Sequence, residues 1–178
     1  DQDVAAWEGE LRTALDLGPS HLSLYQLTIE KGTAFDGTVA AADGDLAADL
    51  YEATQDLCQG AGLPAYEISN HAVPGQESRH NLAYWRYGEY LGLGPGAHGR
   101  LLIDGQRIAT SQRTSPENWR GGARRQTETE LSVAERATEM VMMGLRLTEG
   151  VNSAAFLAET GLALEQWLAG PALERFVD

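Results

Sequence analysis

The chain has 178 residues, a length that corresponds to one domain of ordinary size or to one domain with part of another. With 43% hydrophobic and 22% charged residues, its composition is typical of a globular protein and excludes a disordered one. The net charge of -13 argues against DNA or RNA as the main partner, because phosphate binding needs a basic surface. We therefore expect no nucleic-acid partner.

Residues 1–80 alternate between helical and strand-like patterns. Residues 1–17 show the spacing of an amphipathic helix, with Asp3 placed as its N-cap, and residues 21–29 are rich in β-formers with no turn residue. A second helix is predicted over 46–59 and a short strand over 63–68. This order predicts βα units with a parallel sheet. Because the chain opens on a helix with no strand before it, we expect it to be the later part of a larger protein.

The middle of the chain contains a polar loop, a glycine run and a hairpin pattern. The polar loop is predicted over 69–80, and the glycines of 92–96 indicate a close approach of the backbone to a neighbour or a ligand. Asp104–Gly105 between two β-prone runs predicts a β-hairpin. Residues 111–127 look like a linker, apart from a short helix at 116–119.

From about residue 128 the pattern becomes helical. Ser132 and Glu135 have the spacing of a capping box at the start of an amphipathic helix. Asn152 is placed as the N-cap of the next helix, which Gly161 ends. These signals predict a small helical domain at the end of the chain.

The single cysteine and the four histidines restrict the metal chemistry of the chain. Cys58 alone cannot form a disulfide framework or an all-cysteine zinc or iron–sulfur site. No two histidines have the helical spacing of zinc ligands, and no nucleophile–histidine–acid arrangement is supported. We identify no catalytic residue. The chain also lacks an apolar run of the roughly 20 residues that a membrane span requires and opens with no signal peptide, so we expect a cytoplasmic protein.

Positive charge is concentrated in residues 79–125, which carry eight arginines and three acidic residues within an acidic chain. Such a segment can present a positive face to a carboxylate or a phosphate. The alternative, which the general behaviour of surface charge favours, is that these arginines pair with acidic residues of neighbouring helices.

Residues 78–86 carry the densest chemistry of the chain. They include an imidazole, an amide, a phenol and an indole from His80, Asn81, Tyr84 and Trp85, together with two guanidinium groups. In a helix, His80 and Tyr84 share a face. An imidazole can ligate iron, aromatic rings can stack on a macrocycle and arginines can hold carboxylates, which suits a tetrapyrrole with propionate arms. Composition alone favours the alternative of an interdomain hinge with packed aromatic residues and a hydrogen-bonded His80.

Three blocks of the sequence resemble one known family. They are HLSLYQLTIEKGTAF (21–35), YEISNHAVPGQESRHNLAYWRYGEYLGLGPGAHG (66–99) and LSVAER with the following GLRLTEGV (131–151). These blocks are similar to the C-terminal half of the HemW family of heme chaperones, a radical SAM family related to oxygen-independent coproporphyrinogen III oxidase. The resemblance runs in order from residue 1 to residue 178.

The resemblance implies an α/β fold in three parts. Residues 1–110 are expected to be the later half of a partial (β/α) radical SAM barrel, residues 111–127 a linker, and residues 128–178 the start of a small helical, winged-helix-like C-terminal domain. The family holds a [4Fe–4S] cluster with a CxxxCxxC motif early in the barrel, and nothing in this chain matches that motif. We therefore expect the cluster ligands upstream of this chain.

The resemblance also implies a function and its site residues. HNLAYW matches the family's HNxxYW element, which implies His80 as the heme-iron ligand and Asn81, Tyr84 and Trp85 as its surroundings. By position in the family pattern, the candidate contacts to S-adenosyl-L-methionine (SAM) are the three residues Thr28, Ala97 and His98.

The implied function is a heme chaperone that delivers heme to respiratory proteins, with SAM and a [4Fe–4S] cluster in the intact protein. The alternative is an oxygen-independent coproporphyrinogen III oxidase, which uses SAM for an oxidative decarboxylation in porphyrin biosynthesis. A peripheral membrane association and the oligomeric state are left open.

Overall fold

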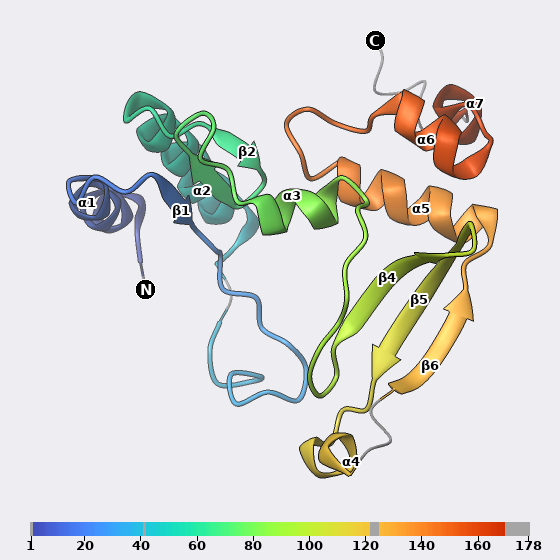
Figure 1. The fold of residues 1–178 in the computed structure, drawn as a ribbon. Helices are drawn as coiled ribbons and strands as arrows, with labels where there is room; N and C mark the ends of the chain where they lie inside the picture. Colours follow the sequence, from blue (N-terminus) through green and yellow to red (C-terminus); the bar gives the residue numbers. More distant parts are fainter. Residues whose placement is uncertain (1, 41, 122–124, 170–178) are drawn as a thin grey trace. The chain divides into compact units, whose positions relative to one another are not determined.

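The computed structural model describes residues 2–40, 42–121 and 125–169. The chain divides into two compact units, Asp1–Ser78 and Arg79–Asp178, referred to below as the first and second units. Each unit combines helices with an antiparallel sheet, which confirms the predicted mixed α/β class (Figure 1). The division follows residue 78 and not the predicted linker, so the boundaries at 110 and 128 remain predictions about the intact protein.

Two helices of the first unit begin directly after an aspartate that caps them. Helix α1, Val4–Leu15, follows Asp3, and helix α2, Gly44–Gly60, follows Asp43. In each case the aspartate side chain accepts a hydrogen bond from the main-chain amide three residues later, at 2.8 and 2.9 Å. Such caps satisfy amides that have no partner within the helix. The cap at Asp3 is confirmed, and α2 begins two residues before its predicted start because Asp43 provides its cap.

The core of the first unit lies between these helices and the sheet. Leu11 of α1, Cys58 of α2 and Leu63 are buried together. Partly buried residues pack against this core, namely Trp7, Leu15, Leu22, Leu24 and Leu57. Apolar side chains of both helices therefore face the inside of the unit.

The two predicted strands of the first unit run in the same direction, but a third strand lies between them, so the predicted parallel sheet is not formed among the described residues. The sheet contains β1 (His21–Ser23), β2 (Ala65–Glu67) and β3 (Asn70–Ala72) in the order β1-β3-β2, and both pairs are antiparallel. The chain reverses directly after β2, where the carboxylate of Glu67 accepts hydrogen bonds from the amide and the hydroxyl of Ser69 at 2.8 and 2.9 Å. This turn places β3, which lies in the predicted polar loop, between β1 and β2.

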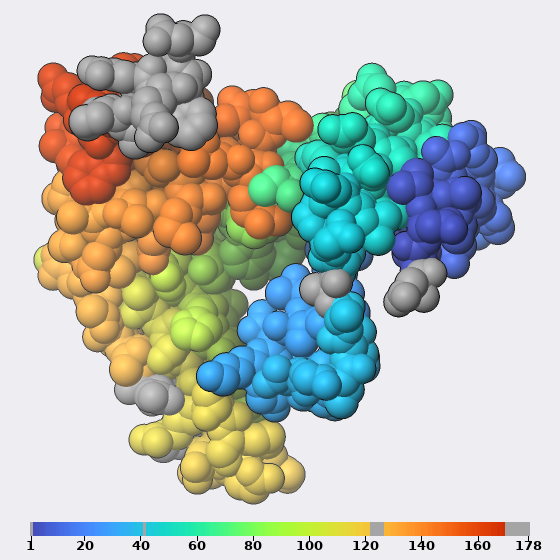
Figure 2. All heavy atoms as spheres, turned by 180° about the vertical axis from the view of Figure 1, so that it is seen from behind, coloured from blue at the N-terminus to red at the C-terminus, as the bar shows by residue number. Residues whose placement is uncertain are grey.

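Beyond β1 the predicted strand over 21–29 does not continue. After Leu24 the chain runs without regular structure and then forms turns over residues 31–38. Figure 2 shows this segment in light blue as a lobe of the first unit outside helices α1 and α2. Its large apolar side chains Tyr25, Leu27 and Phe35 are exposed.

The sheet of the second unit contains the predicted hairpin and one unpredicted strand. Strands β4 (His98–Ile103), β5 (Gln106–Gln112) and β6 (Arg125–Glu130) lie in the order β4-β5-β6, with antiparallel neighbours. Asp104 and Gly105 both have positive φ angles, 50° and 80°, as a two-residue type I′ turn requires. Strand β6 begins within the predicted linker.

Five helices accompany this sheet in the described part of the second unit: α3 (Arg79–Trp85), α4 (Pro116–Arg120), α5 (Val133–Gly144), α6 (Ser153–Thr160) and α7 (Leu164–Leu168). In Figure 1, α5 runs between the sheet and the α6–α7 pair. Tyr87, Ala137, Met140 and Phe156 form the buried core of this unit.

The predicted helix caps of the second unit are confirmed. The hydroxyl of Ser132 accepts a hydrogen bond from the amide of Glu135 at 3.3 Å, and the Glu135 carboxylate accepts one from the Ser132 amide at 2.9 Å. Asn152 caps α6 through the amide of Ala155 at 2.9 Å. Gly161 ends α6 with a φ of 73°, the left-handed conformation expected of a C-terminal glycine.

Ion pairs join the hairpin to helices α5 and α6. Arg100 of β4 contacts Glu139 of α5 at 2.6 Å, and Arg107 of β5 contacts Glu159 of α6 at 2.7 Å. The hydroxyl of Tyr87 donates a hydrogen bond to Glu139 at 2.9 Å. Pairing with acidic residues of neighbouring helices, the favoured alternative for the arginine-rich segment, is therefore confirmed for these arginines.

Candidate functional site

His80 and Tyr84 lie on one face of α3, as the sequence predicts. The Tyr84 hydroxyl is 3.2 Å from His80 Nε2, and the two rings meet edge to face with centroids 4.6 Å apart. The imidazole is exposed to solvent, whereas Tyr84 is partly buried. The helical spacing of four residues therefore produces an accessible imidazole that rests against a phenol ring.

A third ring, that of Tyr90, extends this face beyond the helix. Its centroid is 4.3 Å from that of Tyr84, with an angle of 65° between the planes. Two backbone hydrogen bonds to Arg100, of 2.8 and 2.9 Å, hold Tyr90 beside strand β4. Together, His80, Tyr84 and Tyr90 form a contiguous aromatic row. Burial raises the pKa of Tyr90, against the opposing charge of Arg100, so the phenol keeps its proton at neutral pH.

Sequence reasoning missed Tyr90 because it lies outside the helical repeat that joins His80 to Tyr84. The chain turns sharply after α3: Tyr87 has a φ of 58°, and the amide of Gly88 donates to the carbonyl of Ala83 at 2.7 Å. This reversal brings Tyr90 back against the helix. The only signal in the sequence is the recurrence of tyrosine at positions 84, 87 and 90.

Asn81 and Trp85, the other two residues of the HNLAYW element, are both partly buried. The guanidinium of Arg146 lies over the Trp85 ring, 4.4 Å from its centroid. Trp85 also lines a pocket on which His80 and Tyr84 do not border. The element therefore serves two places: the aromatic row and the pocket beside Trp85.

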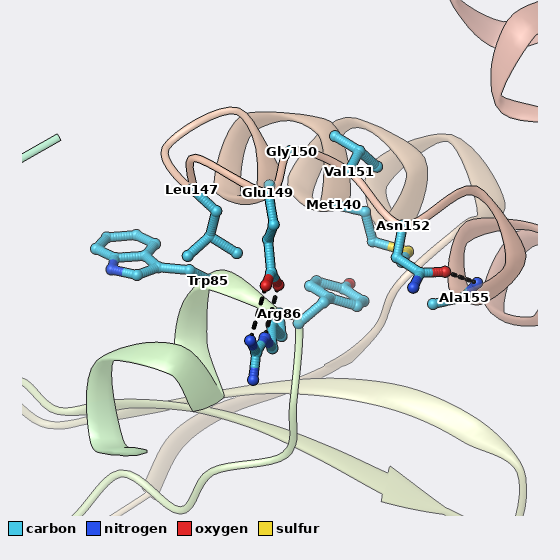
Figure 3. A pocket seen from close by; sticks show the side chains of 11 residues that line it. Trp85, Arg86, Met140, Leu147, Glu149, Gly150, Val151, Asn152 and Ala155 are labelled. Atoms are coloured by element: carbon cyan, nitrogen blue, oxygen red, sulfur yellow. Dashed lines mark hydrogen bonds and ion pairs between the residues drawn. The ribbon is translucent and has the colours of Figure 1, made fainter. Parts of the chain in front are cut away.

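This pocket has a volume of about 490 Å³ and lies entirely within the second unit. Its walls come from the end of α3, from α5 and from the segment leading into α6 (Figure 3). Met140, Leu147 and Val151 supply apolar surface. Arg86 and Glu149 are its charged lining residues and pair with each other through two hydrogen bonds of 2.7 and 2.8 Å.

The three candidate SAM contacts occupy two different units. Thr28 is exposed in the irregular segment that follows β1 in the first unit. In the second unit, Ala97 is partly buried and its carbonyl accepts a hydrogen bond from the Gln112 amide at 2.8 Å, while the exposed His98 is the first residue of β4. A role for these residues in SAM binding stays a prediction.

The glycine run has the close backbone packing that its sequence indicates. A Cβ atom added at Gly92 would collide with the carbonyl group of His98. The side-chain amide of Gln112 also donates a hydrogen bond to the carbonyl of Gly92 at 3.2 Å. The prediction of a close approach is therefore confirmed, and the neighbour is the start of strand β4.

The chain has one cysteine, whereas a CxxxCxxC motif supplies three thiolates to an iron–sulfur cluster. Cys58 is buried in the core of the first unit, and this burial raises the pKa of its thiol, whereas a metal ligand must be a thiolate. Among the described residues, no three histidine, cysteine or acidic side chains gather into a possible metal site. In the same residues, no helix combines the length and the apolar character that a membrane span requires.

Comparisons with known proteins identify the family. Residues 131–178 match the HemN C-terminal domain. The chain is 37% identical over 164 residues to the heme chaperone HemW of Escherichia coli (strain K12), in a match that covers 91% of this chain and 43% of that protein. It is 41% identical over 166 residues to the mitochondrial radical S-adenosyl methionine domain-containing protein 1 of Mus musculus, covering 84% and 37% of the two chains. The chain belongs to the HemW/HemN-like family.

A solved structure of this family also has a similar fold. Coproporphyrinogen III oxidase (HemN) from Escherichia coli, described as a radical SAM enzyme, matches with a TM-score of 0.63 over 93% of this chain and 42% of its own. The sequence identity is 12%, so this likeness is one of fold alone. The chain spans less than half the length of the HemW/HemN-like proteins named here.

Proposed function

We propose that the protein containing this chain is a heme chaperone and that His80 is its ligand to the heme iron. The observation that carries this proposal is the accessible imidazole of the HNLAYW element, which lies at the end of a row of two phenol rings. The names of the relatives in Escherichia coli and Bacillus subtilis, both heme chaperone HemW, support the same function.

The imidazole is suited to bind iron through Nε2. Its contact with the Tyr84 hydroxyl is 3.2 Å long, which is the long end of the usual range of about 2.7–3.2 Å for hydrogen bonds between nitrogen and oxygen. Iron can therefore replace a weak partner, and the hydroxyl can turn to solvent. Because His80 is exposed, heme binding removes water only from the part of the imidazole that the heme covers, and the desolvation cost is small.

The aromatic row gives a macrocycle a surface to lie against. Aromatic pairs favour edge-to-face and offset arrangements, and the Tyr84 ring already packs edge to face with the rings of His80 and of Tyr90. Tyr90 is held on the backbone of β4, so the row does not depend on the short helix α3 alone. In this proposal Tyr84 and Tyr90 orient the cargo, and His80 holds its metal.

The remaining parts of the function belong to the intact protein. We propose that the cluster ligands lie in the part of the relatives that this chain does not match. We also propose that Thr28, Ala97 and His98 of this chain contact SAM in the intact protein. Residues 1–110 would then be the later part of a radical SAM barrel, residues 111–127 a linker, and residues 128–178 the start of a small helical, winged-helix-like domain. Respiratory proteins are the proposed recipients of the heme.

Titration of the intact protein with hemin tests the ligand. We expect a Soret band that shifts on binding and a dissociation constant that rises about tenfold or more in His80→Ala, because one metal ligand is lost. Lys31→Ala is the control, since it removes an exposed side chain outside residues 78–86 that cannot ligate iron in its charged form. This variant should bind hemin as the wild type does.

Two outcomes would contradict the proposal. An unchanged Soret spectrum and affinity in His80→Ala would remove this residue as the ligand. Anaerobic conversion of coproporphyrinogen III to a vinyl product by the intact protein with SAM would favour the alternative function, an oxygen-independent coproporphyrinogen III oxidase. The fold shared with the Escherichia coli oxidase makes this second assay necessary.

A further inference from the structure

The pocket beside Trp85 is separate from the aromatic row. None of His80, Tyr84 and Tyr90 lines it, so its use does not depend on heme ligation. Its volume of about 490 Å³ lies within the range of roughly 300–1,000 Å³ that is usual for small-molecule sites. The lining is mainly apolar with a few polar groups, which is also usual for such sites.

The charged groups of the pocket already show a carboxylate bound to an arginine. Glu149 receives hydrogen bonds from Arg86 Nε and Nη2 at 2.7 and 2.8 Å, the two-pronged geometry in which guanidinium groups recognise carboxylates. Figure 3 shows this pair among the lining side chains, with Leu147 and Trp85 on one side and Met140 and Asn152 on the other. Arg86 is thus placed to hold a carboxylate inside the pocket.

The internal carboxylate is easily exchanged. The side chains of Arg86 and Glu149 are 53% and 52% exposed, and a pair this accessible contributes little to stability. The hydrogen bonds from Arg86 lower the pKa of Glu149, which therefore stays charged at neutral pH and competes with any other anion. Glu149 lies between α5 and α6 and can turn into solvent without disturbing either helix.

We propose that this pocket binds an organic carboxylate with an apolar body. The ligand carboxylate replaces that of Glu149 on Arg86, and the apolar body packs against Trp85, Met140 and Leu147. Because Arg86 is the positively charged residue in the lining, a neutral ligand of the same shape gains only the apolar contacts. Glu149 acts as a built-in competitor that weakens binding of the incoming acid.

Calorimetric titration of the full-length protein with 3-phenylpropionate, and in parallel with octanoate, tests this proposal. The neutral amide of 3-phenylpropionate serves as the isosteric comparison. Glu149→Gln removes the competing charge, and we expect it to bind the acids about three- to fivefold more tightly, the factor that corresponds to an exposed ion pair. Arg86→Gln should bind them about fivefold or more weakly. The control Arg113→Gln removes an exposed arginine outside the pocket and should bind as the wild type does.

The indole resonance of Trp85, assigned with Trp85→Phe, locates the binding. A shift of this resonance with either acid, together with the gain in Glu149→Gln, supports the proposal, and the stronger of the two acids shows whether the body is aromatic or aliphatic. Equal affinity for acid and amide would overturn it. The proposal would also be overturned if neither the wild type nor Glu149→Gln bound the acids, because removal of the competing carboxylate would then not make Arg86 bind them.

Discussion

Among single residues, Glu139 connects more elements of the second unit than its place on a helix suggests. It receives hydrogen bonds from Arg100 on the hairpin and from Tyr87 just beyond α3. The Arg100 and Glu139 side chains are only 16% and 22% exposed, so if the ion pair is broken, little water is available to replace the lost partner. We expect Glu139→Gln to lower the free energy of unfolding by about 1–3 kcal/mol, measured with urea. Glu149→Gln, which breaks an exposed pair, should change it by less than about 1 kcal/mol.

The same residue predicts a pH dependence. Burial alone would raise the pKa of Glu139, but the hydrogen bonds from Arg100 and Tyr87 outweigh it and hold the pKa below its ordinary value. The contribution to stability is therefore complete above the unfolded value of about pH 4.3 and is lost as the pH falls through the lowered folded pKa. Urea unfolding at pH 7, 5 and 3.5 should show a smaller acid loss in Glu139→Gln than in the wild type. Parallel losses in the two proteins would contradict this assignment.

At the scale of elements, the glycine run sets how closely the chain can return to strand β4. A side chain at Gly92 would collide with the backbone at His98, which cannot move aside as a flexible side chain can. We expect Gly92→Ala to cost about 2 kcal/mol or more in urea unfolding. Gly121→Ala is the control, since its Cβ meets the nearest atom at 3.4 Å and its φ of -69° suits any residue. Equal stability of the two variants would show that the backbone at Gly92 is free to shift.

Elements defined by neighbouring residues are predictable from the sequence. Asp3, Ser132 and Asn152 act within three residues of their own position, and Asp104–Gly105 determines the conformation of its own turn. The strands depend on partners far along the chain. The β3 strand follows a turn held by Glu67, and its polar sequence indicates a loop because nothing local marks its pairing with β1.

In the candidate site, too, contacts within one helix are predictable from the sequence and contacts between elements are not. The contact between His80 and Tyr84 follows from helical spacing, and the structure contains it. Tyr90 arrives through a reversal of the chain after α3, and the placement of Trp85 at a pocket with Leu147 and Val151 depends on α5 and α6. Both placements depend on tertiary contacts, which the local sequence does not indicate.

For the whole molecule, the division into two units predicts that they lose structure separately. Each unit has its own core, and regions with separate cores can unfold with different free energies. Amide hydrogen exchange measures these unfolding free energies region by region. We expect Glu139→Gln to speed amide exchange in the second unit and to leave residues 2–40 and 42–78 unchanged. Mass spectrometry of peptic fragments measures both regions in one experiment. Faster exchange throughout the chain would mean that the protein unfolds as a single cooperative body.

Strand β6 has a consequence for the behaviour of the protein at high concentration. It forms one border of its sheet, and its sequence RQTETE contains no large apolar residue, which is why the sequence indicates a linker where this strand begins. An unpaired border strand is a template for fibrils, and charged side chains such as those of Glu128 and Glu130 repel an incoming copy. The composition that conceals this strand from sequence analysis thus also protects the protein against edge-to-edge aggregation.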